Sequence, residues 1–161
     1  MAELATAAAT FINGTAFGAL AFVGAVDAPM LLRLRTTRNG RVTVANLFPI
    51  WWPLGRTFMA PLGVSGIVVN GIAYYVSRSP VRVWWLFPAA MHIATIAWTA
   101  GIMSAPIKAL RFGKENSVED ERHTAANEQN IKKFSYLHYP RIFFGAISFL
   151  VSLALQSNLL A

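Results

Sequence analysis

The sequence predicts an all-α protein, an integral membrane bundle of four transmembrane helices. Of the 161 residues, 55% are hydrophobic and 13% are charged, with a mean hydropathy of +0.47, whereas an average soluble domain carries about 25% charged residues. The apolar residues gather in four long stretches, and most charges lie in the segments between them. We therefore expect the whole chain, 1–161, to form a single membrane domain.

Each of the four apolar stretches is long enough to cross a bilayer. A hydrocarbon core is crossed by roughly 20 helical residues, and lipid requires every backbone group to be paired within its own segment, which favours helices. A soluble helix would need a polar face, yet residues 57–76 and 142–160 contain no charge. The helices are predicted at approximately residues 5–32, 57–76, 83–107 and 138–160.

Two connecting segments are predicted to have features of their own. Residues 32–56 are predicted to form a loop with its turn at Asn39-Gly40. Within that loop, Asn46–Pro53 is apolar and aromatic but too short to span a bilayer, so it should lie along the interface or dip inward as a lid. The polar segment 111–135 is expected to be a solvated helix or a mobile linker, whose charges usually do no chemistry.

The basic residues predict how the helices are oriented. Loops on the cytoplasmic side are enriched in Lys and Arg, so the first and third loops should be cytoplasmic, with both termini and the second loop opposite. In a eukaryotic cell we expect the endoplasmic reticulum membrane, because no organelle transit signal is seen. This distribution explains the net charge of +7 with the lipid bilayer as partner and no nucleic acid. The first loop holds Arg33, Arg35, Arg38, Arg41 and Arg56, the third Lys108, Arg111, Lys114, Arg122, Lys132 and Lys133, and the second Arg78 and Arg82.

Ionisable side chains inside membrane helices are costly and are therefore candidates for function. Asp27 lies near the cytoplasmic end of the first helix, at a depth similar to that of His138 and Arg141 at the start of the fourth. His138 and Arg141 share a helix face because they are three residues apart. We expect Asp27 to pair with one of them, in a catalytic site or in a buried pair that fixes packing. Arg141 could instead extend to the headgroups.

A second polar layer is predicted near the bilayer centre. His92 lies roughly 16 Å from the cytoplasmic end of the third helix, and Asn13 and Asn70 fall at a similar depth. The two asparagines are expected mainly to hold the bundle together, with ligand binding as the alternative. Thr99 extends the His92 face. Because histidine can take up a proton near neutral pH, His92 suits a general base better than it suits a packing role.

Three tryptophans are candidates for stacking on a flat ligand: Trp51, Trp52 and Trp98. Trp98 lies inside the third helix, where its indole N–H must find a partner or its ring must line a cavity. No bound cofactor is expected, since the chain has no Gly-rich dinucleotide loop and no cysteine. A di-iron bundle would need several intramembrane carboxylates, whereas only Asp27 is available; the sequence nevertheless leaves a metal open.

Three local patterns resemble a known family. The third helix carries His92–Thr99 and continues through Pro106, the fourth helix opens with Phe-Ser-Tyr-Leu-His-Tyr-Pro-Arg at 134–141, and a small-residue run in the first helix ends at Pro29. Together they resemble the DUF1772 group of small four-helix membrane proteins, which includes the fungal anthrone oxygenases. That family shows Pro-x-Asn-x-x-Leu ending the third helix and aromatic-x-x-x-His-x-x-Arg opening the fourth. This chain keeps Pro106, Leu110, His138 and Arg141, but has Lys108 in place of Asn and Phe134 in place of the common Trp.

The resemblance implies a membrane oxidoreductase, a monooxygenase of polyketide secondary-metabolite biosynthesis. It would oxidise an anthrone, a hydrophobic aromatic molecule, to an anthraquinone, with O2 as co-substrate. We expect His138 or His92 to remove a proton, Arg141 to stabilise the anion and Asp27 to orient either partner. The expected substrate contacts are Trp98, Trp51, Trp52, Asn70, Asn13 and Thr99.

Two other functions fit the same features. The chain could be a non-catalytic carrier or scaffold subunit, or an enzyme of the same fold that acts on another hydrophobic biosynthetic intermediate. No inverted repeat or pair of broken helices indicates a transporter. The sequence leaves open which histidine is the base and whether the chain forms a homo-oligomer.

Overall fold

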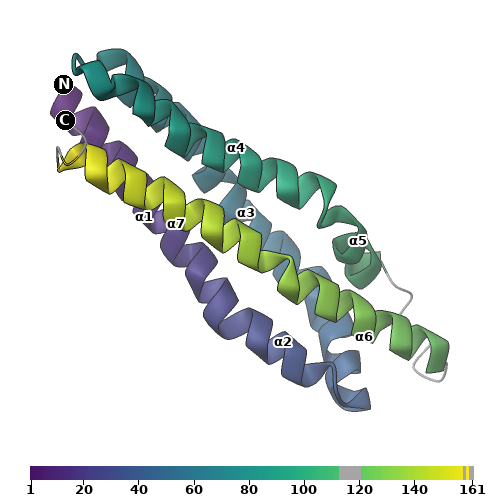
Figure 1. Ribbon diagram of the computed structural model, residues 1–161. Coiled ribbons are helices and arrows are strands. Elements are labelled where there is room, and N and C mark those ends of the chain that lie inside the picture. Colours follow the sequence, from purple (N-terminus) through teal and green to yellow (C-terminus); the bar gives the residue numbers. More distant parts are fainter. Residues whose placement is uncertain (113–120, 158, 160–161) are drawn as a thin grey trace.

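The computed structural model describes residues 1–112, 121–157 and 159, and every regular element among them is a helix (Figure 1). Within this described part, four helical spans are long and apolar enough to cross a membrane. The predicted all-α fold with four helices of spanning length is therefore confirmed. The spans are Ala2–Leu34, Arg38–Val76, Pro80–Gly101 and Ala126–Gln156.

The first span widens near its end without breaking. It consists of α1 (Ala2–Phe22), a π-helical turn η1 (Val23–Asp27) and α2 (Ala28–Leu34). Pro29 has no N–H to complete the ordinary helical ladder. The N–H of Ala28 bonds to the carbonyl of Val23, five residues back. A π turn of this kind holds one extra residue, which changes the direction of the side chains that follow.

The second span begins earlier than the sequence predicts. Helix α3 runs over Arg38–Val76, so the segment predicted as a loop, 32–56, is mostly helical. Thr37 caps this helix, since its Oγ1 accepts a hydrogen bond from the Gly40 N–H at 3.1 Å. Asn39-Gly40 therefore forms the first turn of a helix and not a loop turn. The tight chain reversal lies just before Thr37.

The predicted lid or interfacial segment, Asn46–Pro53, is also part of α3. Pro49 and Pro53 each remove a backbone hydrogen bond, which is why the sequence predicts no continuous helix here. Phe48 is only 2% exposed and belongs to a buried cluster with α5 and α6. This packing stabilises the helix despite the hydrogen bonds that are missing at its prolines. The helix ends at Val76, as the sequence predicts.

The remaining chain forms a short 3-10 helix η2 (Pro80–Trp85) and helices α4 (Leu86–Gly101), α5 (Ser104–Phe112), α6 (Glu121–Tyr136) and α7 (His138–Gln156). The predicted third helix, 83–107, is thus interrupted after Gly101. Two forms were expected for the polar segment 111–135, a solvated helix or a mobile linker. Over α6 the segment is a helix, and its residues 113–120 lie outside the described part. Only Leu137 separates α6 from α7. Pro140 lies in the first turn of α7, where a missing N–H costs little.

The four long helices surround one interior. Helix α1 packs against α3 and α7, and α4 packs against the same two helices. The termini and the connection from α3 to α4 lie at one end of the bundle, while α2, α5 and α6 lie at the other (Figure 1). We call the latter the basic end, because it carries Arg33, Arg35, Arg38, Arg41, Lys108 and Arg111.

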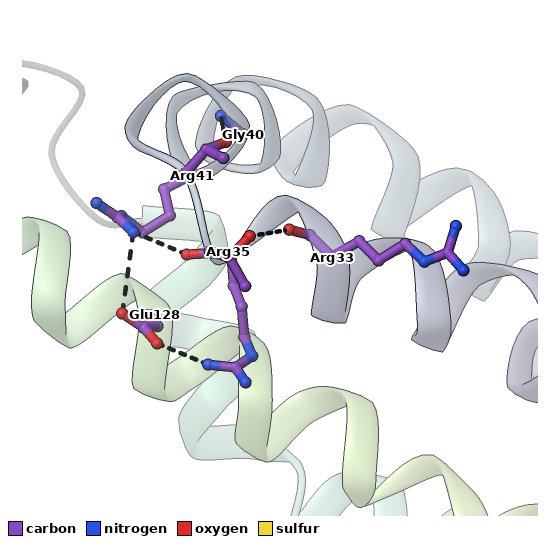
Figure 2. A network of polar contacts seen from close by, with 7 residues as sticks. Arg33, Arg35, Gly40, Arg41 and Glu128 are labelled. Atoms are coloured by element: carbon purple, nitrogen blue, oxygen red, sulfur yellow. Dashed lines mark hydrogen bonds and ion pairs between the residues drawn. The ribbon is translucent and has the colours of Figure 1, made fainter.

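A carboxylate of α6 ties the basic end together (Figure 2). Glu128 Oε1 accepts a hydrogen bond from Arg35 Nη1 at 2.6 Å, and its Oε2 lies 3.9 Å from Arg41 Nη1. Arg41 Nη1 also donates to the carbonyl of Arg35 at 2.8 Å. Glu128 is 41% exposed, so each ion pair stabilises the fold by only about 0–1 kcal/mol. The main effect of the network is to fix the turn between α2 and α3 against α6.

The outward faces of the bundle are strongly apolar. Many large hydrophobic side chains are more than half exposed, and they come from several of the long helices. A water-soluble bundle would cover such surfaces or replace them with charges, whereas lipid-facing helices need no polar cover. Examples are Leu47, Ile50, Phe58, Val64, Phe143 and Leu150.

Candidate functional site

A cavity of about 430 Å³ lies between the helices. Its wall is built from α1, α3, α4, α5 and α7, and also from Val23 of η1. Small-molecule sites typically measure about 300–1,000 Å³, so the cavity is large enough for a ligand of several rings. Much of the wall is apolar, with Leu20, Met59, Ile96 and Ile107 among its side chains.

Two of the three predicted stacking tryptophans lie in this wall, Trp51 and Trp52. The ring of Phe48 stacks on Trp52 with centroids 6.0 Å apart and planes 2° apart. Phe134 meets Trp51 and Trp52 edge-on, at 6.2 and 5.5 Å. Because aromatic packing from behind holds both indoles, they form a rigid surface on which a flat ligand could stack.

Trp98 does not line the cavity, contrary to its expected contact with substrate. Its Nε1 donates a hydrogen bond to the carbonyl of Leu137 at 3.0 Å, so the indole finds its partner within the bundle and connects α4 to the junction of α6 and α7. Thr99, one residue further on, does lie in the wall. Its Oγ1 donates to the carbonyl of Thr95 at 2.8 Å.

His138 and Arg141 come together in the first turn of α7, and both line the cavity. They are 3% and 5% exposed. Arg141 Nη1 lies 3.2 Å from His138 Nδ1. A guanidinium can only donate, so Nδ1 accepts and the proton of a neutral His138 ring resides on Nε2. The helix spacing predicted that these residues share a face, and the structure brings them into contact.

Two donors at this point have no acceptor. His138 Nε2 and Arg141 Nε are buried and make no hydrogen bond to any described residue. Buried polar atoms in native proteins are nearly always paired, and an exception calls for an explanation such as a missing ligand. Arg35 Nε, Arg41 Nε and Ser135 Oγ are buried without a partner as well. Among these residues only His138 and Arg141 line the cavity, where an oxygen atom of a bound molecule would accept from one or both donors.

Asp27 does not pair with His138 or Arg141, so the predicted ion pair is wrong for the described residues. Asp27 also lies outside the cavity wall. The reason is the π turn. Ala16, Leu20 and Val23 line the cavity at helical spacing, and the next residue of that stripe would be Asp27. One extra residue in the turn rotates the following side chains by about 100° and removes Asp27 from the stripe.

The predicted polar layer of Asn13, Asn70 and His92 is present. The Asn13 and Asn70 amides form a reciprocal pair, with Nδ2 to Oδ1 distances of 3.1 and 2.9 Å. His92 Nε2 lies 2.8 Å from Asn13 Oδ1. Asn13 and Asn70 are fully buried and do not line the cavity. They therefore hold α1, α3 and α4 together, and their predicted contact with substrate is not supported.

His92 connects this layer to the cavity, since its ring lies in the wall. Asn13 Oδ1 is an acceptor, so the short contact places the His92 proton on Nε2. The other nitrogen, Nδ1, then carries a lone pair, and it makes no hydrogen bond within the described chain. Nδ1 is therefore the His92 nitrogen with a lone pair free to accept a proton, while Asn13 holds Nε2.

A glycine makes room for His92. Gly66 of α3 faces the ring so closely that an added Cβ would overlap its atoms. The carbonyl of Gly66 accepts a hydrogen bond from Asn70 Nδ2 at 2.6 Å, which fixes the same turn of α3. Only glycine allows α3 and the imidazole to approach this closely. Nothing in the sequence around Gly66 indicates this partner.

Cations gather near the part of the wall closest to the basic end. Arg56 of α3 and Lys108 and Arg111 of α5 line the cavity together with Arg141. Neither Asp nor Glu occurs among the described residues of the wall. A wall that contains cations and no described acid favours ligands that carry negative charge.

Ser148 is among the polar contributors that sequence reasoning missed. Its Oγ lies 3.4 Å from His92 Nε2 and 3.5 Å from the carbonyl of Pro88. The signal was present as a polar or small stripe on α7, formed by Arg141, Gly145, Ser148 and Ser152 at helical spacing, all buried. In the sequence, Lys108 bears only on the orientation of the helices in the membrane and on the departure from the family pattern, whereas in the structure it lines the cavity.

No group of three or more His, Asp or Glu side chains suited to hold a metal ion occurs in the described ranges. No family model matches the chain, and no curated protein or solved structure is significantly similar to it.

Proposed function

We propose that the protein is a multi-pass membrane oxygenase that oxidises a hydrophobic anthrone to an anthraquinone with O2. The reaction is suggested by the resemblance of the segments around Pro106 and His138 to anthrone oxygenases. One observation carries the proposal. Buried donors of His138 and Arg141 lack acceptors in an apolar, tryptophan-lined cavity that also contains His92.

The chemistry suits such a cavity. An anthrone has an acidic CH2 group opposite its carbonyl, and loss of one proton gives an enolate with negative charge on the carbonyl oxygen. The enolate carbon donates electrons to O2 and forms a C–O bond, which gives a peroxide. Loss of the second proton from that carbon and cleavage of the O–O bond then release water and leave a new carbonyl. One oxygen atom enters the quinone and the other leaves as water, so no further reductant is needed.

The hydrogen bonds assign different roles to the two histidines in this proposal. His92 is the general base, because its Nδ1 has no partner in the described chain. His138 donates from Nε2 and cannot act as base there without losing its contact with Arg141. His138 and Arg141 stabilise the enolate oxygen, since preorganised donors in a water-poor site are most effective where charge develops. Trp51 and Trp52 stack on the rings.

The test is O2 uptake by membranes that contain the protein, supplied with emodin anthrone and compared with empty membranes. We expect uptake well above the background oxidation of the anthrone. His92→Ala should lower turnover by about 100-fold or more, and Arg141→Ala by a similar factor. Arg78→Ala, at the far end of the bundle from the basic end, is the matched control. Full turnover in both His92→Ala and His138→Ala would refute the assignment of the base and the donor.

The same assay separates the alternatives. Uptake that a chelator abolishes would point to a metal-dependent enzyme. Uptake with another acidic hydrophobic molecule, but not with an anthrone, would indicate an enzyme of the same fold with a different substrate. Saturable binding without any O2 uptake would favour a carrier or scaffold subunit.

The proposed orientation places the basic end in the cytoplasm, following the rule that cytoplasmic loops are enriched in Lys and Arg. In a eukaryotic cell the proposed membrane is the endoplasmic reticulum. With this orientation, a hydrophobic intermediate would reach the cavity from a membrane whose cytoplasmic face lies at the basic end of the protein.

A further inference from the structure

The strongest unexplained feature of the interior is the charge of Arg141. Its guanidinium is 5% exposed and contacts His138 Nδ1, a neutral acceptor. Among the residues that the structure describes, Arg141 has no carboxylate within ion-pair distance. Arginine stays protonated in proteins, and buried charges are normally paired. The partner is therefore expected to come from outside the bundle.

The surroundings specify the chemistry of this partner. Arg141 Nε and His138 Nε2 both donate and both lack acceptors, so the partner must present oxygen lone pairs. Since the guanidinium is positive and the described wall contains no acid, an oxyanion fits better than a neutral carbonyl. The rest of the partner must be apolar, because side chains such as Leu20, Met59 and Ile96 form the neighbouring wall.

The wall also indicates how such a molecule enters. Gly55 and Ala60 of α3 and Ala100 of α4 line the cavity and are exposed. Ile96, which is also exposed in the wall, narrows the gap beside Gly63. Gly55 has no side chain, and Ala60 and Ala100 have small ones, so they leave space at these two rims. The cavity therefore opens sideways between α3 and α4, and this opening faces the surrounding lipid if the bundle spans a membrane. Arg56 and Lys108 are exposed beside it and would attract an anionic group at the membrane surface.

We propose that the cavity is a binding site for acidic amphiphiles dissolved in the membrane, which enter between α3 and α4 and place their oxyanion on Arg141 and His138. The ligand class comprises ionised carboxylic acids and phenols with an apolar body. The inference shares its cavity with the proposed function but requires no oxidation, so the two can fail separately. An acidic lipid of this class should also compete with an anthrone for the cavity.

The binding test uses the full chain in nanodiscs of phosphatidylcholine, under argon, with radiolabelled dodecanoate and dodecanol as matched probes. We expect saturable binding of dodecanoate and at least tenfold weaker binding of dodecanol. Arg141→Gln and His138→Phe should each weaken dodecanoate binding at least tenfold, whereas Arg78→Gln should leave it unchanged. Equal binding of acid and alcohol by the unmodified protein would overturn the oxyanion site, and this result does not depend on any variant folding.

The entrance is tested by a pair of substitutions on one helix. Ala100→Trp places a large ring at the opening, while Ala97→Trp places it on an exposed part of α4 outside the wall. We expect Ala100→Trp to slow dodecanoate association severalfold and Ala97→Trp to leave it unchanged. An unchanged association rate in Ala100→Trp would overturn the lateral entrance. Acid-selective binding without O2 uptake from an anthrone would support this inference while refuting the proposed oxygenase.

Discussion

Two histidines line the same cavity, yet their hydrogen bonds give them opposite properties. His138 accepts from Arg141 at Nδ1 and is left with an N–H to donate. His92 donates to Asn13 from Nε2 and is left with a lone pair. This difference depends on which atoms meet across helices, so sequence spacing could select both residues as candidates but could not decide which one accepts a proton.

The unbalanced charge of Arg141 leads to a prediction about stability. Arg141→Met keeps most of the side-chain volume and removes a buried charge without a described counter-ion. Removal of such a charge should stabilise the ligand-free protein by about 1 kcal/mol or more, which corresponds to a rise of roughly 2–4 °C in Tm for a chain of this size. Thermal unfolding in detergent measures this.

The matched control for this prediction is Arg78→Met, which removes an exposed arginine and should change stability by no more than about 0.5 kcal/mol. Oxygenase activity and dodecanoate binding should be lost only in Arg141→Met. A lower Tm for Arg141→Met than for the unmodified protein would show that Arg141 serves mainly to hold the fold together.

Asp27 shows where residue-level prediction failed. Its depth and charge made it the natural partner for Arg141, and a regular α-helix would have continued the stripe of Leu20 and Val23 to this position. The extra residue of the π turn rotated it away. Pro29 was visible in the sequence, but its local effect could have been a kink, a break or a π turn. Packing decides between these outcomes.

Helix α3 makes the same point at the scale of elements. Prolines and an Asn-Gly pair usually mark loops, and that pattern led to a predicted loop over 32–56. The structure has one helix from Arg38, because the Thr37 cap begins it and the burial of Phe48 holds it. The apolar run 57–76 was predictable as helix because its length and composition decide it, although Pro61 lies within it. Tertiary packing decided the rest.

The contact between α3 and α4 at Gly66 gives a second prediction. Gly66→Ala adds a Cβ that would overlap the His92 ring, whereas an added Cβ at Gly71, on the same helix, meets nothing within 4 Å. Alanine favours a helix over glycine by roughly 0.5–1 kcal/mol, so Gly71→Ala should be neutral or stabilising. Gly66→Ala should instead destabilise the protein by about 1–3 kcal/mol and lower turnover by displacing His92.

Unfolding by sodium dodecyl sulfate in mixed micelles measures both glycine variants, with O2 uptake assayed in parallel. Because the two substitutions change helix propensity equally, their difference isolates the contact with His92. Equal stability and equal turnover of the two variants would mean that His92 moves aside freely, and it would weaken the case for a preorganised base.

The whole molecule has apolar sides and one basic end, and this polarity predicts its orientation. The chain contains no cysteine, so single cysteines can report the side of the membrane without background. In sealed microsomes with the cytoplasmic face outward, Thr36→Cys at the basic end should react with a membrane-impermeant maleimide. Ser157→Cys at the other end should react only after the membrane is permeabilised. The opposite pattern would reverse the proposed orientation.

The buried guanidinium of Arg141, with the acidic ligand proposed for it, would also link the lifetime of this protein in the cell to metabolism. A ligand that binds only the folded chain stabilises it by about 2.7 kcal/mol at one hundred times its Kd, and changes of this size alter cellular abundance severalfold through quality control. Cells that produce the acidic ligand should therefore accumulate the protein, while cells that lack it should degrade the protein faster at the same rate of synthesis. A chase experiment with and without the ligand would measure this difference, and Arg141→Met should abolish it.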